Sequence, residues 1–350
     1  MLTMNVALIG AGNISGIYLS NLGTRFPAVR VIGVCDLIRE KAEAAAGQFG
    51  VQIYDDMHAA FADPAVDAIV NLTRPHQHYD VTRQALIAGK HVYSEKPLAA
   101  AIEQGRELVA LAAEKGLYLG GAPDTFLGDG IQTCRALIER GEIGRPVAAT
   151  AFMTGHGPES WHPDPAFFYQ FGGGPMMDMG PYYVSALVEL MGRVRSVMGM
   201  AETSFAERTM TCKEHFGEVI RPEVATHVGG LMRFESGAIA TIVTSFDVWA
   251  AQLPRIEIYG ELGTLSAPDP NTFRGPVLLY KPEWGEFREQ PLLSTEFSEN
   301  CRGLGIDGMA AAIAANRPDF ACSHRRTFHV LDVMTGFVRS SRSGAAVEMA

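Results

Sequence analysis

A carboxylate and a phenol lie four residues apart in this chain, shortly after a run of three glycines. Asp178 and Tyr182 follow Gly172-Gly173-Gly174, and residues four apart on a helix face the same side. Farther upstream, Lys96 stands between an acid and a proline in Glu95-Lys96-Pro97. An ammonium, a carboxylate and a phenol together can orient an alcohol and remove its proton. These residue types predict a site that moves a proton to or from a hydroxyl group.

The three side chains are expected to share this proton transfer. An ammonium close to a phenol favours the ionised phenolate, so Lys96 would let Tyr182 act as a general base. A carboxylate such as Asp178 raises the pKa of a neighbouring phenol or ammonium. We therefore assign Asp178 to orienting the substrate hydroxyl and Lys96. The alternative is that Lys96 itself transfers the proton, and the sequence leaves both assignments open.

Each of these residues also has a purely structural interpretation. Lys96 would be a surface residue near a proline that ends a strand, and Asp178 would cap a helix that begins near Met176. Tyr182 would be a half-buried core aromatic beside Tyr183. The catalytic interpretation is favoured because the three residues occur together with a glycine-rich turn near the N-terminus.

That turn has the form of a dinucleotide-binding loop. Gly10-Ala11-Gly12-Asn13-Ile14 follows a short apolar run and precedes a helical pattern. Gly10 would form the tight turn, Gly12 would let the backbone approach a pyrophosphate, and the helix N-terminus would attract the phosphate charge. The third fingerprint position is Ser15 with Gly16 beside it, so the match is imperfect.

An acid follows at the distance expected for a ribose contact. Asp36 lies 20 residues beyond Gly16 (36 − 16 = 20). An acid there accepts hydrogen bonds from the ribose 2′-OH and repels a 2′-phosphate, so NAD is predicted, with NADP left open because Arg39 is near. The predicted cofactor-binding residues are Gly10, Gly12, Asn13, Ile14, Asp36, Thr73, Glu95 and Lys96.

Two weaker signals concern loops. Trp161-His162 stands in a loop rich in glycine and proline, and this pair suits stacking on and hydrogen bonding to a sugar ring. The predicted substrate-binding residues are Lys96, Trp161, His162, Asp178 and Tyr182. His78 or Arg74 follows a predicted strand end, where a contact with the nicotinamide is one interpretation, but a histidine at a helix start is more often structural and we assign neither residue to the site.

The first third of the chain alternates short β-branched runs with helical patterns, as parallel sheets with crossover helices do. Strands are predicted at Val6–Ile9, Val29–Cys35, Ala68–Leu72, His91–Ser94 and Leu117–Gly120, and helices at Arg39–Phe49, Val81–Ala88 and Ile102–Lys115. The pattern predicts an α/β fold with an N-terminal, doubly wound Rossmann domain over residues 1–124.

The remainder changes character after a predicted helix at Ile131–Arg140. Long strand-like runs occur at Pro146–Thr154, Val194–Thr203, Val224–Phe234, Ala238–Phe246 and Arg255–Tyr259, with an exposed connection at Pro282–Ser298. Consecutive strands without helices predict an α+β domain over residues 125–350 with an open, largely antiparallel sheet. A last helix, about residues 327–340, would return to pack on the first domain.

Composition narrows the range of partners. The net charge of -10 disfavours nucleic acid and anionic membranes, so a small-molecule substrate is expected. Five scattered cysteines without C-x-x-C spacing predict neither disulfides nor zinc, and the histidines lack metal-ligand spacing. No stretch approaches a membrane span. We therefore expect a cytoplasmic protein without a metal.

Four segments together resemble the Gfo/Idh/MocA family of sugar and polyol oxidoreductases, over nearly the whole chain. They are Gly10 to Ile14, Gly89-Lys90-His91-Val92-Tyr93-Ser94-Glu95-Lys96-Pro97-Leu98, Gly172 to Tyr182, and Ile258-Tyr259-Gly260-Glu261-Leu262-Gly263-Thr264-Leu265. The resemblance implies a Rossmann domain that binds NAD or NADP, and a homodimer or homotetramer packed through the second domain's sheet. Many polyol dehydrogenases of the family have His where this chain has Tyr182, which is more similar to the glucose-fructose oxidoreductase and dimeric dihydrodiol dehydrogenase branches.

Three functions are compatible with these residues. The first is an NAD(P)-dependent oxidoreductase that transfers hydride at a CH-OH carbon of a sugar, cyclic polyol or related diol. The second is a glycosidase that oxidises the sugar transiently, so that the glycosidic bond can be eliminated. The third is a cofactor-binding sensor without chemistry. The presence of Lys96 and Tyr182 favours an enzyme, because a sensor has no need of an ammonium and a phenol.

Overall fold

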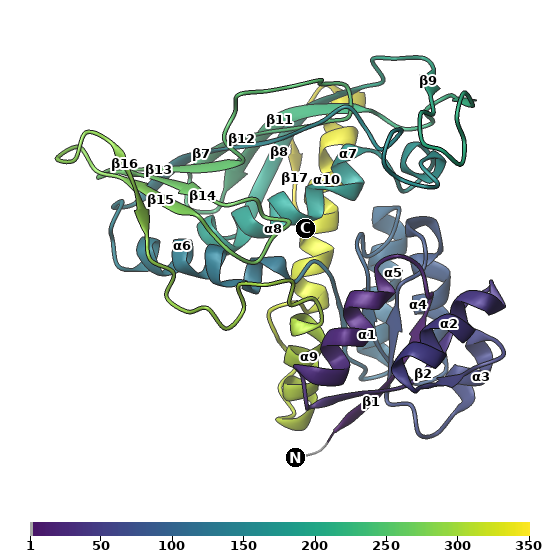
Figure 1. Cartoon of the computed structure of the whole chain (residues 1–350). Helices are drawn as coiled ribbons and strands as arrows, with labels where there is room; N and C mark the ends of the chain where they lie inside the picture. Colours follow the sequence, from purple (N-terminus) through teal and green to yellow (C-terminus); the bar gives the residue numbers. More distant parts are fainter. Residues whose placement is uncertain (1–2) are drawn as a thin grey trace. The chain divides into compact units, whose positions relative to one another are not determined.

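The computed structural model describes residues 3–350 (Figure 1). The chain forms two compact units, and residues 300–331 belong to the first although they come late in the sequence. The first unit ends its N-terminal part at Asp124 and includes Asn300–Leu331, while the second contains Thr125–Glu299 and Asp332–Ala350. The last helix, α10 (His324–Ser343), has residues in both units. The assignment of separate functions to residues 1–124 and 125–350 stays a prediction.

The first unit contains a six-stranded parallel sheet within the described residues, in the order β3-β2-β1-β4-β5-β6. The strands are β1 (Met4–Ile9), β2 (Val29–Cys35), β3 (Gln52–Ile53), β4 (Ala68–Asn71), β5 (His91–Ser94) and β6 (Leu119–Gly121). Helices α1 (Ser15–Thr24), α2 (Arg39–Phe49), α3 (Met57–Ala62), α4 (His78–Ile87), α5 (Ile102–Glu114) and α9 (Leu304–Ala314) accompany it, with a short η1 (Pro75–Gln77). All four residues of β4 are buried, as expected for a strand covered on both faces.

The predicted α/β class is confirmed. Val29–Cys35, Arg39–Phe49 and His91–Ser94 form the elements expected for them. The short edge strand β3 was not predicted, because two residues carry no alternation that a sequence pattern can reveal.

The second unit is built on a nine-stranded mixed sheet among the described residues, ordered β16-β15-β14-β13-β7-β12-β11-β8-β17. Its strands are β7 (Pro146–Thr154), β8 (Val194–Glu202), β11 (His227–Phe234), β12 (Ile239–Ser245), β13 (Ile256–Gly260), β14 (Thr264–Ala267), β15 (Val277–Tyr280), β16 (Phe287–Gln290) and β17 (Val347–Glu348). Only β7 and β12 pair in parallel among these neighbours. The predicted largely antiparallel sheet is therefore confirmed.

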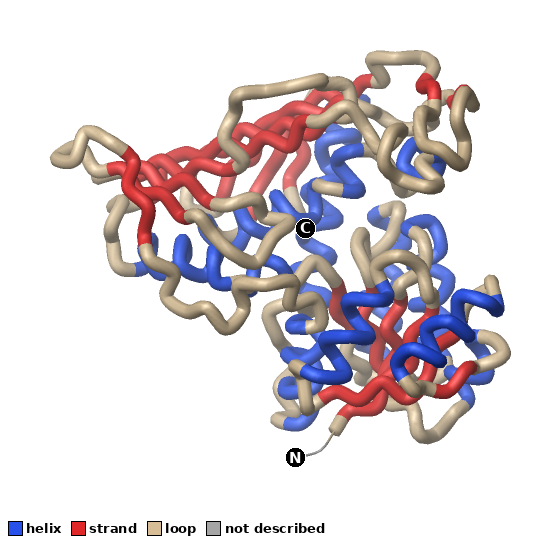
Figure 2. Tube along the Cα trace, in the orientation of Figure 1, coloured by secondary structure: helices blue, strands red, loops and turns tan. Residues whose placement is uncertain are grey.

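Helices lie along one face of this sheet (Figures 1 and 2). They are α6 (Asp129–Glu139), α8 (Gly180–Met191) and the later part of α10. A Cβ atom on Gly199 or on Gly230 would lie 2.7 Å from the ring of Phe337 in α10. These two paired glycines therefore let the Phe337 ring pack directly on the backbone of β8 and β11.

Two parts of the second unit differ from the sequence prediction. Strands β14, β15 and β17 and the small pair β9 (Arg208–Thr209) and β10 (Val219–Ile220) were not predicted. The segment Pro282–Ser298, expected to be only an exposed connection, contains β16, which pairs with β15. Most of β16 is exposed, so it shows little of the hydrophobic pattern that marks a strand.

All five cysteines are unpaired and buried. Burial raises the pKa of the Cys35 thiol to about 11, and nearby Asp56 and Asp36 act in the same direction. Among the described residues, no helix is long and apolar enough to cross a membrane.

Candidate active site

The glycine turn after β1 requires glycine at its first position. Gly10 has a φ of +100°, and a Cβ there would lie 2.7 Å from the carbonyl oxygen of Leu72. At Gly12 a Cβ would meet no atom within 4 Å. Gly10 therefore permits the close approach of β1 and β4, whereas Gly12 borders open space that can receive another molecule.

The N-terminus of α1 presents main-chain donors to this space. The Ser15 hydroxyl bonds the Gly12 carbonyl at 2.7 Å, and no side chain caps the helix at Ile14. The N–H groups of Gly12, Asn13 and Ile14 have no hydrogen-bond acceptor within residues 3–350. Free N–H groups at a helix N-terminus attract phosphate oxygens. The turn thus fits the pyrophosphate of a dinucleotide.

Asp36 is fixed beside the turn. Its Oδ2 accepts from the N–H of Ala11 at 2.7 Å, and its Oδ1 accepts from the N–H of Ile38 at 2.8 Å. Arg39 is held by two acids, with Nε 3.1 Å from Glu43 and Nη1 3.0 Å from Asp55. The carboxylate is therefore set to accept ribose hydroxyls, and the guanidinium already has anionic partners.

The predicted residues of the first unit share one edge of its sheet. Gly10 follows β1, Asp36 follows β2, Thr73 follows β4 and Lys96 follows β5. These four strands are parallel and adjacent in the order β2-β1-β4-β5, so their carboxyl ends lie along the same edge. Ligands of such sheets bind beyond the carboxyl ends of the strands. The structure thus brings the predicted cofactor residues to one edge.

Glu95 supports the segment that carries Lys96. Its side chain is buried, Oε1 accepts from the Tyr18 hydroxyl at 2.7 Å, and Oε2 accepts from the N–H of Lys96 at 2.9 Å. Burial raises the pKa of Tyr18 well above its usual value, and Glu95 adds to this, so the phenol stays a donor. The peptide bond between Lys96 and Pro97 is cis. A cofactor contact by Glu95 stays a prediction.

Two buried polar residues behind this edge were not predicted as part of the site. Asn71, at the end of β4, accepts from the Thr73 hydroxyl at 2.6 Å and donates to the carbonyl of His78 at 3.0 Å. His78 is 1% exposed and contacts two main-chain carbonyls. The ring is enclosed, so the structure supports the structural interpretation of His78. Spacing within the sequence gave no signal for a contact between His78 and Pro97.

Asp178 and Tyr182 lie in the second unit on two different helices. Asp178 ends the short α7 (Pro175–Asp178), whereas Tyr182 lies in the first turn of α8. The expectation of one helix from Met176 onward is therefore wrong. Pro181 lacks the N–H that a continuous helix needs at this point, and the N–H of Tyr182 bonds Met179 instead.

Two structural interpretations of these residues can now be judged. Asp178 is not an N-cap, because Gly174 precedes α7, Met179 precedes α8, and neither helix has a side-chain cap. Tyr182 is buried at 7% exposure, rather than half-buried. Lys96 belongs to the first unit and Asp178 and Tyr182 to the second, and a shared catalytic role for the three stays a prediction.

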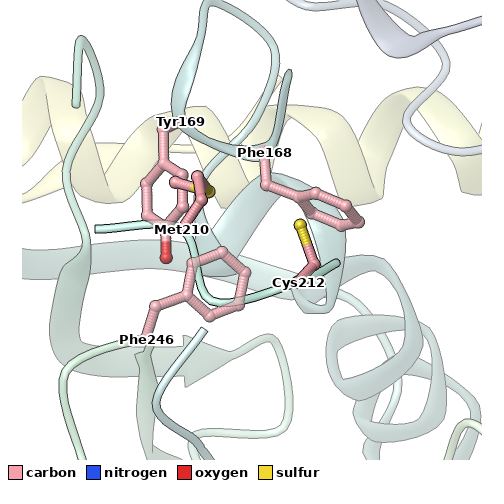
Figure 3. Packing of buried hydrophobic residues seen from close by; sticks show 5 residues of the cluster. All are labelled: Phe168, Tyr169, Met210, Cys212 and Phe246. Atoms are coloured by element: carbon pink, nitrogen blue, oxygen red, sulfur yellow. The ribbon is translucent and has the colours of Figure 1, made fainter. Parts of the chain in front are cut away.

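Trp161 and His162 occupy a loop anchored by aromatic packing. The Trp161 indole is 67% exposed, and its Nε1 donates to the carbonyl of Gly157 at 3.2 Å. The His162 ring packs edge-on against Phe168, with centroids 5.0 Å apart. A buried cluster lies beneath this loop (Figure 3) and consists of Phe168, Tyr169, Met210, Cys212 and Phe246. The indole face is thus exposed on a fixed support.

A buried arginine also anchors this loop and was missed by the sequence analysis. Nε of Arg208 bonds Glu159, Nη1 bonds Asp247 at 2.9 Å, and Nη2 bonds the carbonyl of His156 at 2.8 Å. The Arg208 side chain is only 3% exposed. The Arg208 guanidinium therefore joins its own segment to two others that are far away in the sequence. No local motif in the sequence indicates such a contact. Within residues 3–350, no cluster of three or more His, Cys, Asp or Glu suits a metal ion.

Comparisons with known proteins agree with this arrangement. Residues 4–121 match a family described as "Oxidoreductase family, NAD-binding Rossmann fold", and residues 131–266 match the GFO/IDH/MocA C-terminal domain. D-glucoside 3-dehydrogenase of Escherichia coli K12 is 30% identical, covering 99% of this chain and 97% of that protein. 1,5-anhydro-D-fructose reductase of Ensifer adhaerens is 29% identical, covering 74% of each.

A solved structure shares the fold of the whole chain. Levoglucosan dehydrogenase in complex with NADH and L-sorbose superposes with a TM-score of 0.82 at 19% identity, covering 99% of both chains. The family matches include the cofactor turn and the strands β7 to β13 of the second unit. With its NAD-binding Rossmann fold and a relative matched over nearly its full length, this chain belongs to the Gfo/Idh/MocA family of oxidoreductases.

Proposed function

We propose that this protein oxidises a ring hydroxyl of a sugar, glycoside or cyclic polyol with NAD, and reduces the corresponding ketone in the reverse direction. The observation that carries this proposal is the shared sheet edge. The glycine turn, Asp36, Thr73 and Lys96 all follow carboxyl ends of adjacent parallel strands. A cofactor bound there is within reach of an ammonium that can act on a substrate hydroxyl.

NAD is preferred over NADP in this proposal. Asp36 offers acceptor oxygens to the ribose hydroxyls and would repel a 2′-phosphate. Arg39, the residue that could offset this repulsion, has Glu43 and Asp55 as partners. When bound, NAD supplies the acceptor for the hydride that leaves the substrate carbon.

In this proposal, side chains of the protein accept the proton of the substrate hydroxyl. Tyr182 Oη takes the proton of the substrate hydroxyl, Lys96 Nζ stabilises the ionised phenol, and Asp178 orients the hydroxyl. The alternative proton acceptor is Lys96 Nζ. A lysine variant that keeps slow turnover, with the rise in activity moved to higher pH, would favour Tyr182, while loss of that rise would favour Lys96.

The substrate class follows from two lines of support. The exposed indole of Trp161 presents a flat apolar face of the kind that stacks on sugar rings. The relative matched over 99% of this chain is named D-glucoside 3-dehydrogenase. We therefore rank glucosides first, and inositols and anhydrosugars next.

The test is nicotinamide absorbance with purified protein, NAD or NADP, and a panel of glucosides, aldoses, inositols and anhydrosugars. The expected result is NADH formation with one substrate class and weaker use of NADP. Release of an aglycone without net NADH would instead indicate a glycosidase that recycles its cofactor. Cofactor binding with no product from any substrate would overturn the proposal.

We further propose a homo-oligomer formed through the sheet face opposite the helices of the second unit. Leu231 of β11 pairs in register with Met198 of β8, and Met200 and Ile239 project from the same face. These side chains are 43% to 78% exposed. A second copy of the same apolar face would cover them, as self-complementary dimer interfaces do.

A further inference from the structure

His78 connects two loops at the candidate cofactor edge. It is the first residue of α4 and is almost completely buried. Its Nδ1 lies 2.7 Å from the carbonyl oxygen of Pro97, directly after Lys96, and its Nε2 lies 2.9 Å from the carbonyl oxygen of Thr73. One imidazole ring thus spans the segments that follow β4 and β5.

The chemistry of these contacts constrains the ring's proton count. A carbonyl oxygen only accepts hydrogen bonds, so each contact needs an N–H on the ring. A neutral imidazole has one N–H, and only the protonated ring has two. A nitrogen lone pair facing a carbonyl oxygen at such a distance is repelled. The contact with both carbonyls therefore belongs to the protonated ring.

We propose that His78 is a proton-dependent clamp that positions Lys96: the protonated ring bonds the carbonyls of both Thr73 and Pro97, and loss of one proton releases one of them. This inference rests on the proposed role of Lys96 in proton transfer. His78 is a positioning residue, since it acts on the substrate only through the segment that carries Lys96.

The released carbonyl is that of Pro97. Thr73 is also held by Asn71, whose Oδ1 accepts from the Thr73 hydroxyl at 2.6 Å and from the Thr73 N–H at 3.2 Å. Asn71 bonds the main chain of His78 as well, at 3.0 Å. The Thr73 side of the clamp is therefore fixed without the ring proton, and the Pro97 side depends on it.

The charged groups around His78 set the pH range of the change. Burial is the largest influence and holds the pKa of His78 below its ordinary value of 6.5, and Lys96 acts in the same direction. The two carbonyls and the Glu95 carboxylate raise the pKa. The clamp is therefore complete only in acid, below the ordinary pKa of histidine, and one-sided at neutral pH and above.

Nitrogen NMR of histidine-labelled protein without cofactor tests the clamp directly. His78 is assigned by comparison with H78Q. We expect both ring nitrogens to carry protons in acid, with one proton lost at a pH below the ordinary histidine pKa of 6.5. A ring that keeps a single proton from acid to neutral pH, or titrates only above its ordinary pKa, would overturn the proposal. This measurement needs no turnover.

Kinetics provides the functional readout, with NADH and a ketone substrate at a pH below the titration found by NMR and at about pH 8. H78Q donates from one nitrogen only, so we expect its kcat to be about tenfold lower than wild type in acid, on the scale of small misplacements of reacting groups. Near pH 8 it should match wild type within about twofold. The control is H91Q, at the opposite end of β5, where the half-buried ring accepts from the N–H of Tyr118 at 3.1 Å.

The NMR and kinetic experiments distinguish failure of the clamp from failure of the proposed function. An equal loss of H78Q activity at both pH values would show a merely structural histidine and would overturn the clamp. Absence of wild-type turnover with any sugar or polyol would defeat the proposed function, while the NMR titration would still decide whether the clamp exists. If H78Q does not fold, His78 is assigned instead by elimination, with single His→Gln variants of the other nine histidines.

Discussion

The main-chain N–H of Ala11 donates a hydrogen bond of 2.7 Å to Oδ2 of Asp36 and so joins the glycine turn to the end of β2. The carboxylate is fixed on its other side by Ile38 at 2.8 Å. It therefore needs no rearrangement to meet a ribose, and such preorganisation strengthens binding. We therefore expect the turn and the acid to recognise the cofactor as one unit.

Replacing Asp36 with serine should change the cofactor preference. We expect kcat/KM for NAD to fall about 10- to 100-fold, as for a lost charged hydrogen bond of about 1.5–3 kcal/mol, and that for NADP to rise. Initial rates with both cofactors measure the change. Asp55→Asn, which touches only Arg39, should leave the NAD value unchanged, and an equal loss for both cofactors in D36S would contradict the assignment.

Replacing Lys96 with methionine should remove the proton-transfer chemistry while keeping most of the side-chain volume. We expect kcat to fall by about 10²- to 10⁴-fold, the usual contribution of a general acid or base. Binding of NADH, followed by fluorescence, should change little. The matched control is Lys115→Met on an exposed position after α5, and turnover at the wild-type rate in K96M would exclude a catalytic lysine.

Asp124 should make stability depend on pH. Burial raises its pKa from 3.8 to about 6, although the N–H groups of Gly303 and Gly305 lower it in part. Because the native state holds its proton at a higher pH than the unfolded state, stability falls as the pH rises from about 4 to about 6. The change is about 3 kcal/mol, at about 1.4 kcal/mol per pKa unit.

Asp124→Asn removes this dependence because the amide stays neutral. Urea unfolding should show the variant gaining stability relative to wild type between about pH 4 and about pH 7. The exposed Asp80→Asn serves as the control. A difference between variant and wild type that is constant with pH would refute the buried-acid explanation.

Arg208→Met should destabilise the second unit. Glu159 and Asp247 would remain as buried acids without their cation, which costs about 3–5 kcal/mol. Thermal unfolding measures the loss. Arg221 pairs with Glu207 on the surface, with 82% of its side chain exposed, and Arg221→Met should cost at most about 1 kcal/mol. If both variants lost similar amounts of stability, the burial of Arg208 would not explain its contribution.

Leu231→Glu should separate the proposed oligomer. A charge at the centre of an apolar interface remains unpaired when two copies meet, so association weakens. Light scattering after size-exclusion chromatography gives the mass of each variant. Leu262→Glu, at an exposed loop between β13 and β14, should keep the wild-type mass, and an unchanged mass in L231E would rule out this face.

Sequence patterns predicted the elements with strong periodicity. Val29–Cys35 and Pro146–Thr154 form strands over the expected residues, and four of the seven residues of Val29–Cys35 are β-branched, as strands favour. The exposed β16 lacked that pattern. The break between α7 and α8 was missed because Asp178 and Tyr182 were assigned to one helix, although Pro181 stands between them.

The residues of the candidate site that the sequence predicted well belong to short local motifs. The glycine turn and Asp36 form a local motif, and the structure fixes them together by a direct hydrogen bond. The sequence did not predict the contacts of Asn71, His78 and Arg208. Their partners are main-chain carbonyls or acids far away in the sequence, and such contacts produce no recognisable spacing of residues. Long-range contacts of this kind follow only from the folded chain.

The interruption at Met179 places the acid and the phenol on two helical segments that share this residue as their common end. The N–H of Asp178 bonds the carbonyl of Gly174, while Tyr182 lies in the first turn of a twelve-residue helix and its N–H bonds Met179. Substitutions in the glycine run would thus act on the segment of the carboxylate first, and would reach the phenol only through Met179.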